Sequence, residues 1–178
     1  PFWTSVLVRS YAWMVLLGRH GLINEALIAL GMIDRPIRIL NTPLATQIAM
    51  IHILLPYMIL PIANALRQID PSLIRAASGL GSTPFMTFRQ VILPLSMSGV
   101  AAGTLLTFVL ALGFYITPAM VGGPRDITLS MLIAQQVDQL NWAYAATLSA
   151  VLLATALAIL AVARKLPGVG NAFKTSMR

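Results

Sequence analysis

Side chains that could carry out a reaction are sparse in this sequence of 178 residues. Cysteine is absent, which excludes thiolate metal sites and cysteine nucleophiles. The two histidines, His20 and His52, are isolated and have no metal-ligand spacing. Segment 168–175 holds two glycines and a Lys-Thr pair, but Phe173 occupies the position where a phosphate-binding loop requires glycine. We therefore expect no catalytic residue, no metal site and no cofactor in this chain.

The polar segment 70–94 has the clearest pattern, which is typical of two short helices. Asp70 is a favoured N-cap residue and Pro71 suits the first helical position, so a first helix is predicted over 71–80. Gly81 is expected to end it. Its apolar residues recur at helical spacing, and they are Leu73, Ile74, Ala77 and Leu80.

A second short helix is predicted directly after the glycine. Thr83 or the preceding serine can cap it, and Pro84 suits its first position. Phe85 and Phe88 are three residues apart and share a face. We expect Pro94 to end this helix, because proline has no amide hydrogen. These features alone are also compatible with a structured connection between two membrane spans.

Long apolar segments lie on both sides of this loop in the sequence. The sequence is 58% hydrophobic and 10% charged, whereas soluble domains carry about 25% charged residues. A water-soluble core of this size cannot bury so much apolar surface. Membrane-spanning helices are predicted at 2–17, 44–66, 98–120 and 142–163. The first is short and is expected to be the end of a helix that begins upstream. The predicted fold class is all-α, a polytopic transmembrane helical protein.

The loops on the other side of the predicted spans contain shorter elements. A helix is expected near residues 22–30 of loop 18–43. Loop 121–141 opens with a Gly-Gly-Pro turn and continues as an amphipathic stretch suited to the membrane interface. Its two acidic residues, Asp126 and Asp138, form no obvious catalytic pair.

Basic residues favour one orientation in the membrane. The net charge is +7, but the basic residues form no stripe beside aromatic platforms, so nucleic acid is not an expected partner. Loop 67–97 and the tail 164–178 carry seven of the Lys and Arg residues, against four in loops 18–43 and 121–141. The positive-inside bias therefore predicts that 67–97 and the C-terminus are cytoplasmic.

Polar residues in the apolar segments are candidates for a transport pathway or for contacts between helices. Arg9 is the only charge inside an apolar segment. A charge at mid-bilayer costs about 2.5–3.5 kcal/mol, so Arg9 is expected to be paired, to snorkel or to face water. The other candidates are Asn64, Tyr115 and Thr117. Gly99 and Gly103 are four residues apart and predict close packing between helices.

Segment 70–94 resembles the cytoplasmic motif of binding-protein-dependent ABC permeases: Glu-Ala-Ala, three residues, Gly, nine residues, Ile-x-Leu-Pro. All spacings agree, and the corresponding residues are Arg75, Ala76, Ala77, Gly81, Val91, Ile92, Leu93 and Pro94. Two positions depart from the motif. Val91 replaces isoleucine, which is a mild change, whereas Arg75 replaces glutamate and inverts a charge. Any salt bridge that the glutamate makes to an ATPase therefore does not carry over to this chain.

Patterns along nearly the whole chain are similar to those of the spermidine/putrescine-type permease family. They are Pro1-Phe2-Trp3-Thr4-Ser5 with Arg9 and Tyr11-Ala12-Trp13, Gly21-Leu22-Ile23-Asn24, Asp70-Pro71-Ser72, and Thr117-Pro118 with Gly122-Gly123-Pro124. The resemblance implies a type I ABC importer permease of six spans in the bacterial inner membrane, of which this chain would hold the last four. It also implies a second permease subunit, a cytoplasmic ATPase dimer, a periplasmic solute-binding protein and a small solute such as a polyamine.

The same resemblance implies that loop 70–94 couples transport to ATP hydrolysis by the partner, so that the chain itself is not an enzyme. A protruding short helix can sit in a groove on another protein. Small residues at Ala76, Ala77 and Gly81 would allow close approach, and the apolar anchors would be Leu73, Leu80, Phe85 and Phe88.

Two other classes of protein make different predictions. A secondary transporter or channel that works without an ATPase would place an acidic or histidine coupling site within the spans. A membrane-embedded enzyme would bring a nucleophile, base or metal ligands together. The sequence contains no pattern typical of either class.

Overall fold

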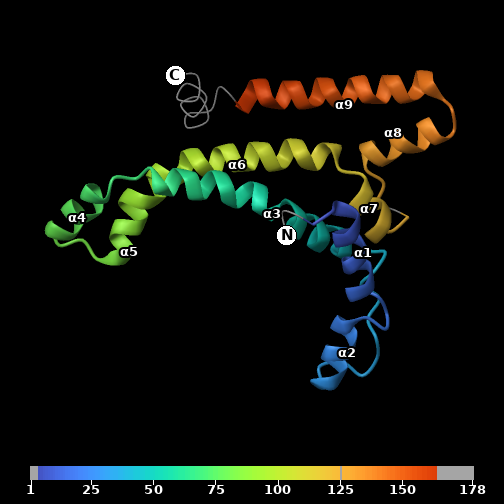
Figure 1. Cartoon of the computed structure of the whole chain (residues 1–178), viewed down its shortest axis with the longest axis horizontal. Coiled ribbons are helices and arrows are strands. Elements are labelled where there is room, and N and C mark those ends of the chain that lie inside the picture. The colour runs from blue at the N-terminus through green and yellow to red at the C-terminus, as the bar shows by residue number, and fades with distance from the viewer. Residues whose placement is uncertain (1–3, 125, 164–178) are drawn as a thin grey trace. The chain divides into compact units, whose positions relative to one another are not determined.

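A computed structural model of the chain describes residues 4–124 and 126–163, and every regular element in these ranges is helical (Figure 1). The predicted all-α class is therefore confirmed. Residues 1–3, which include the start of the first predicted span, and the basic tail 164–178 lie outside the described residues. The elements are α1 (Val6–Leu16), α2 (Leu22–Ala29), α3 (Pro43–Arg67), α4 (Pro71–Gly79), α5 (Pro84–Thr87), the π-helix η1 (Phe88–Ile92), α6 (Leu93–Gly113), α7 (Ile116–Val121), α8 (Leu129–Asp138) and α9 (Trp142–Ala163).

The chain divides into two compact units. The first joins residues 1–54 to 110–155, and the second joins 55–109 to 156–178. The long helices α3, α6 and α9 each contribute residues to both units.

Three described helices are long and apolar enough to cross a membrane: Pro43–Arg67, Pro84–Gly113 and Trp142–Ala163. The bounds of α3 and α9 agree closely with the predicted spans 44–66 and 142–163. By contrast, α1 is apolar but has only 11 residues, whereas a span requires about 20.

The prediction of a single helix over 98–120 is wrong. The helix α6 ends at Gly113, and α7 follows as a separate short helix. Pro118 has no amide hydrogen, so it cannot bond to the carbonyl of Phe114 four residues earlier. That carbonyl instead accepts a hydrogen bond of 2.8 Å from the hydroxyl of Ser130. A residue at the start of α8 thus satisfies the backbone where the helix is interrupted.

The prediction that Pro94 ends the second short helix is also wrong. Residues Pro84–Gly113 form one helical run through α5, η1 and α6. In η1 the amide of Leu93 donates to the carbonyl of Phe88, five residues earlier. A regular α-helix would press the proline ring against the carbonyl of Gln90. The change to a π-helix just before the proline relieves this conflict, so the helix continues.

The first unit has a small buried core, and a pair of buried hydroxyl groups joins two of its helices. Its buried core consists of Leu17, Ala45, Ala49 and Val121. Ser10 of α1 and Thr117 of α7 share a hydrogen bond of 2.9 Å, and both side chains are fully buried. A buried hydroxyl pair of this kind satisfies two polar groups at once, so it fixes α1 against α7.

The predicted helix near residues 22–30 is confirmed as α2, and Asn24 in it organises the following loop. Its side-chain oxygen accepts a hydrogen bond of 2.9 Å from the amide of Ile37. Its side-chain nitrogen donates to the carbonyls of Gly18 and Ile37, both at 3.0 Å. One buried amide therefore holds the segments on both sides of α2.

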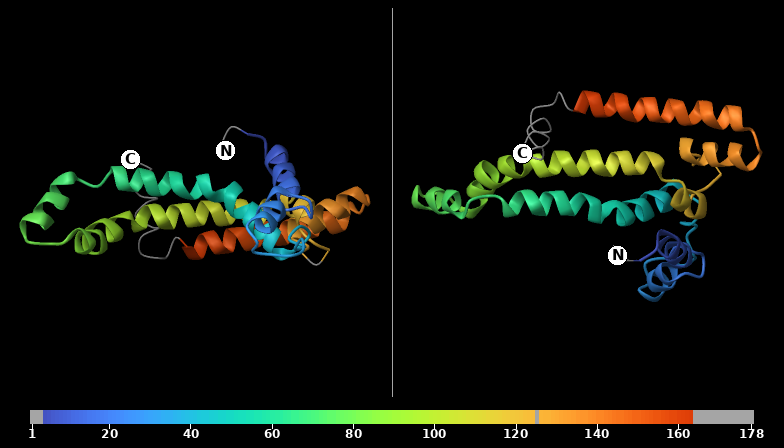
Figure 2. Two further views of the ribbon diagram at one scale, coloured as in Figure 1. Left: turned by 90° about the horizontal axis from the view of Figure 1, so that it is seen from below. Right: turned by 45° about the horizontal axis from the view of Figure 1, so that its top comes forward.

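In the second unit the C-terminal half of α3 lies alongside α6 (Figure 2). A Cβ atom added at Gly99 would be 2.5 Å from Cβ of Ala65 and 2.7 Å from the carbonyl oxygen of Pro61. One added at Gly103 would be 2.9 Å from Sδ of Met58. These distances are too short for a side chain, so the predicted close packing at the two glycines is confirmed.

Candidate functional site

The first short helix of the loop, α4, begins as the sequence predicts. The carboxylate of Asp70 accepts a hydrogen bond of 2.8 Å from the amide of Ser72, and Pro71 occupies the first turn. The backbone hydrogen bond from Ser72, followed by that of its side chain, lowers the pKa of Asp70 below its usual value. A lowered pKa means that the cap stabilises α4 above the unfolded pKa and is lost as the pH falls through the folded pKa.

A left-handed glycine joins α4 to α5. Gly81 has a φ of +82°, a conformation that side chains disfavour. The amide of Ser82 donates to the carbonyl of Ala77 at 3.1 Å, which closes the end of α4. The hydroxyl of Thr83 then caps α5 by accepting from the amide of Met86 at 3.3 Å. The predicted pair of helices with a glycine turn is thus confirmed, and α4 packs against α5 and η1 (Figure 1). We call this pair, Asp70 to Thr87, the hairpin.

The apolar residues expected to act as anchors are exposed on the hairpin and at its end. Leu80 is 89% exposed and Phe85 is 73% exposed, and Leu73 and Phe88 are exposed as well. Arg75 is also exposed on α4. Large apolar side chains presented together in this way are typical of a surface that contacts another protein.

The remaining motif positions are distributed along the same helical run. Ala76 and Ala77 are in α4, and Val91 is half-buried in η1. Leu93 and Pro94 are exposed at the start of α6. The structure therefore joins all the motif positions into the hairpin and its continuation, while their role in coupling stays a prediction.

The other candidate residues do not gather in one place. Arg9 is 9% exposed, and its Nε has no hydrogen-bond partner in the part of the chain that the structure describes. Thr117 is enclosed by the contact with Ser10, which gives it a packing role. Asn64 is exposed on α3 in the second unit. Of the four candidates, only Tyr115 lines the pocket described below.

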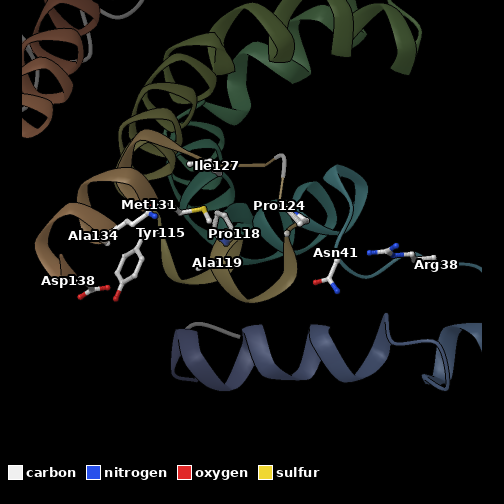
Figure 3. Close-up of a pocket in the computed structure, with 13 residues that line it drawn as sticks. Arg38, Asn41, Tyr115, Pro118, Ala119, Pro124, Ile127, Met131, Ala134 and Asp138 are labelled. Carbon is white, nitrogen blue, oxygen red and sulfur yellow. The ribbon is translucent and has the colours of Figure 1, made fainter. Parts of the chain in front are cut away.

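A pocket of about 600 Å³ lies in the first unit, between α7, α8 and the segment that precedes α3. Figure 3 shows the side chains of Tyr115 and Asp138 beside each other at one end and Arg38 at the other. The buried Pro118 and the half-buried Met131 lie between the ends. The volume is in the range of about 300–1,000 Å³ that small-molecule sites occupy.

Sequence reasoning did not assign Asp138 to a site. The two acidic residues of this loop have separate positions, because Asp126 accepts a hydrogen bond of 2.9 Å from the amide of Gly123 and closes a turn. A usable signal was present in α8, where Met131, Gln135 and Asp138 recur at helical spacing and share one face. All three line the pocket.

Comparisons with known proteins agree with these features. Residues 5–164 match the model of a family described as binding-protein-dependent transport system inner membrane component. The chain is 39% identical to the spermidine/putrescine transport system permease protein PotB of Haemophilus influenzae, over 84% of this chain and 52% of that protein. It is 37% identical to PotB of Escherichia coli, over 84% of this chain and 54% of that protein. It is 38% identical to the inner membrane ABC transporter permease protein YdcU of Escherichia coli, over 76% of this chain and 47% of that protein. The chain spans about half the length of the curated relatives it matches.

Proposed function

The chain belongs to the family of binding-protein-dependent transport system inner membrane components, and on this premise we propose that it helps to form the translocation pathway of an ATP-driven importer. In this proposal a second permease subunit completes the pathway, a periplasmic solute-binding protein delivers the solute, and a cytoplasmic ATPase dimer hydrolyses ATP. The observation that carries the proposal is the hairpin, which presents Leu80 and Phe85 with most of their surface free.

The hairpin suits the transmission of force into the membrane. Its second helix is continuous with a predicted span, because Pro84–Gly113 is one helical run. A partner that grips Phe85 would therefore move α6 as a rigid body, without a flexible joint between them. Ala76, Ala77 and Gly81 leave room for the close approach of a groove on the ATPase.

The proposed solute is a polyamine such as spermidine or putrescine. Support comes from the relatives named for spermidine/putrescine transport, which are 37% and 39% identical to this chain. The binding protein would set most of the specificity, because it selects the solute before the solute reaches the membrane.

The proposed orientation has loop 67–97 and the C-terminal tail in the cytoplasm of a bacterium, with the chain in its inner membrane. The excess of Lys and Arg in these two segments supports this orientation. The hairpin would then face the ATPase, and the pocket beside Asp138 would face the periplasm.

We expect the complete complex, reconstituted in proteoliposomes, to hydrolyse ATP in a vanadate-sensitive manner that its binding protein stimulates. The same vesicles should take up radiolabelled spermidine or putrescine only when ATP is supplied. A complex with an inactivated ATPase subunit is the control. Uptake of equal rate in this control would contradict the proposal and favour a secondary transporter.

We expect Arg75→Glu to assemble and to transport at a rate within about sixfold of wild type. The position is exposed, and an exposed ion pair contributes about 0.2–1 kcal/mol, or less than about sixfold. The measurement is spermidine uptake together with co-purification of the ATPase. Arg89→Glu, which reverses the charge of another exposed arginine in η1, is the matched control. Loss of the ATPase in Arg75→Glu alone would show that the partner has adapted to arginine.

A further inference from the structure

The pocket of the first unit has opposite electrostatic character at its two ends. Asp138 is the last residue of α8, where the aligned peptide dipoles give the helix end a partial negative charge. A carboxylate at this end is repelled by the helix and therefore destabilises it slightly. Arg38 lines the opposite end, so it does not neutralise the carboxylate (Figure 3).

The side chains beside Asp138 suit an organic cation. Tyr115 lies next to the carboxylate in Figure 3 and is 46% exposed, so its ring and phenol oxygen are accessible. An ammonium group is attracted by a carboxylate and also by the face of an aromatic ring. Gln135, one turn before Asp138 on the same face of α8, adds a side-chain carbonyl that can accept from an ammonium group.

The rest of the pocket suits an aliphatic chain. Met131 of α8 and Pro118 of α7 line it between the two ends, and Ala134 of α8 lines it near Asp138 (Figure 3). Arg38 disfavours a second positive group at the far end. The pocket therefore suits one ammonium group and the methylene groups attached to it, with the rest of a longer molecule left outside.

We propose that this pocket is a low-affinity binding subsite for one end of an alkyl amine, with Asp138 and Tyr115 as the residues that recognise the ammonium group. The inference rests on the proposed function, because it identifies where the permease itself would contact a polyamine after release from the binding protein.

The test measures spermidine binding to the purified permease–ATPase complex without its binding protein, by isothermal titration calorimetry. We expect Asp138→Asn to raise the Kd about tenfold or more, since a charge-assisted hydrogen bond is lost. Glu25→Gln, which removes one negative charge from the exposed surface of α2, should leave the Kd unchanged. Tyr115→Leu should weaken binding in the same direction as Asp138→Asn.

Competition with spermidine by three linear molecules of different charge provides a second test. The diamine 1,8-diaminooctane should compete with spermidine, whereas 1,8-octanediol, of the same length without charge, should not. Equal Kd values for wild type and Asp138→Asn would overturn the inference, and so would competition by the dicarboxylate suberate through Arg38. A complex that takes up spermidine with its binding protein but does not bind it alone would overturn the inference and leave the proposed function intact. A complex that takes up no polyamine would instead refute the solute named in the proposed function.

Discussion

Gly81→Asp is expected to lower spermidine uptake by more than about a hundredfold while the protein remains in the membrane at wild-type amounts. The backbone at Gly81 is left-handed, with a φ of +82°, so any side chain strains the turn. Apart from its two chain neighbours, no atom of the described residues lies within 4 Å of an added Cβ. Aspartate therefore disturbs no packing inside the membrane domain. Its carboxylate would, however, be buried unpaired against the proposed ATPase groove, which costs several kcal/mol.

The controls for this prediction separate backbone strain from charge. Gly79 is in the last turn of α4, has open space around it and lacks a left-handed backbone. Gly79→Ala should therefore transport as well as wild type, because alanine favours the helix. The uptake rate of Gly81→Ala should lie between that of wild type and that of Gly81→Asp, because alanine strains the turn but adds no charge. Uptake is measured in whole cells and insertion by the amount of protein in the membrane fraction, and normal uptake by Gly81→Asp would refute the coupling role of the hairpin.

Gly99→Leu is expected to lower the thermal unfolding midpoint of the membrane domain strongly. A Cβ at this position would be 2.5 Å from Cβ of Ala65 and 2.7 Å from the carbonyl oxygen of Pro61, and neither atom is the end of a flexible side chain. The two helices would have to separate, and overpacking of even a few methylene groups costs about 1–3 kcal/mol. The measurement is the recovery of a monodisperse complex in detergent, together with its thermal unfolding midpoint.

A graded series tests whether packing at Gly99 is the cause. Gly103→Ala should lower the unfolding midpoint less than Gly99→Ala, because the nearest atom to its added Cβ is Sδ of Met58, which can move. Gly113→Ala should have little effect, since no described atom outside its own helix backbone and chain neighbours lies within 4 Å of a Cβ added there. Equal midpoints for the three alanine variants would mean that the contact between α3 and α6 does not depend on glycine.

Features that act over three or four residues were predictable from the sequence. The cap at Asp70, the turn at Gly81 and the cap at Thr83 each depend on hydrogen bonds to residues close by in the chain. The spans α3 and α9 were also predictable, because their length and apolar composition are sufficient to identify a membrane-spanning helix.

Features that depend on distant partners were not predictable. The interruption after Gly113 is stabilised by the hydroxyl of Ser130 on the carbonyl of Phe114, sixteen residues away. The pocket combines Arg38, Tyr115 and Asp138 from three separate segments. No periodic pattern in the sequence indicates that such residues lie close together, because their proximity depends on how the helices pack. The continuation through Pro94 was missed for another reason, since propensity alone does not indicate a change from α-helix to π-helix.

The π-helix η1 also fixes the angular phase between the hairpin and α6. Each residue advances an α-helix by about 100°, and a π-turn contains one residue more than a regular turn. Deleting a single residue within Phe88–Ile92 would therefore restore a regular α-turn, which keeps Gly99 facing Pro61 and Ala65 but presses the ring of Pro94 against the carbonyl one turn earlier. The extra residue of η1 thus allows a proline at position 94 inside one continuous helical run.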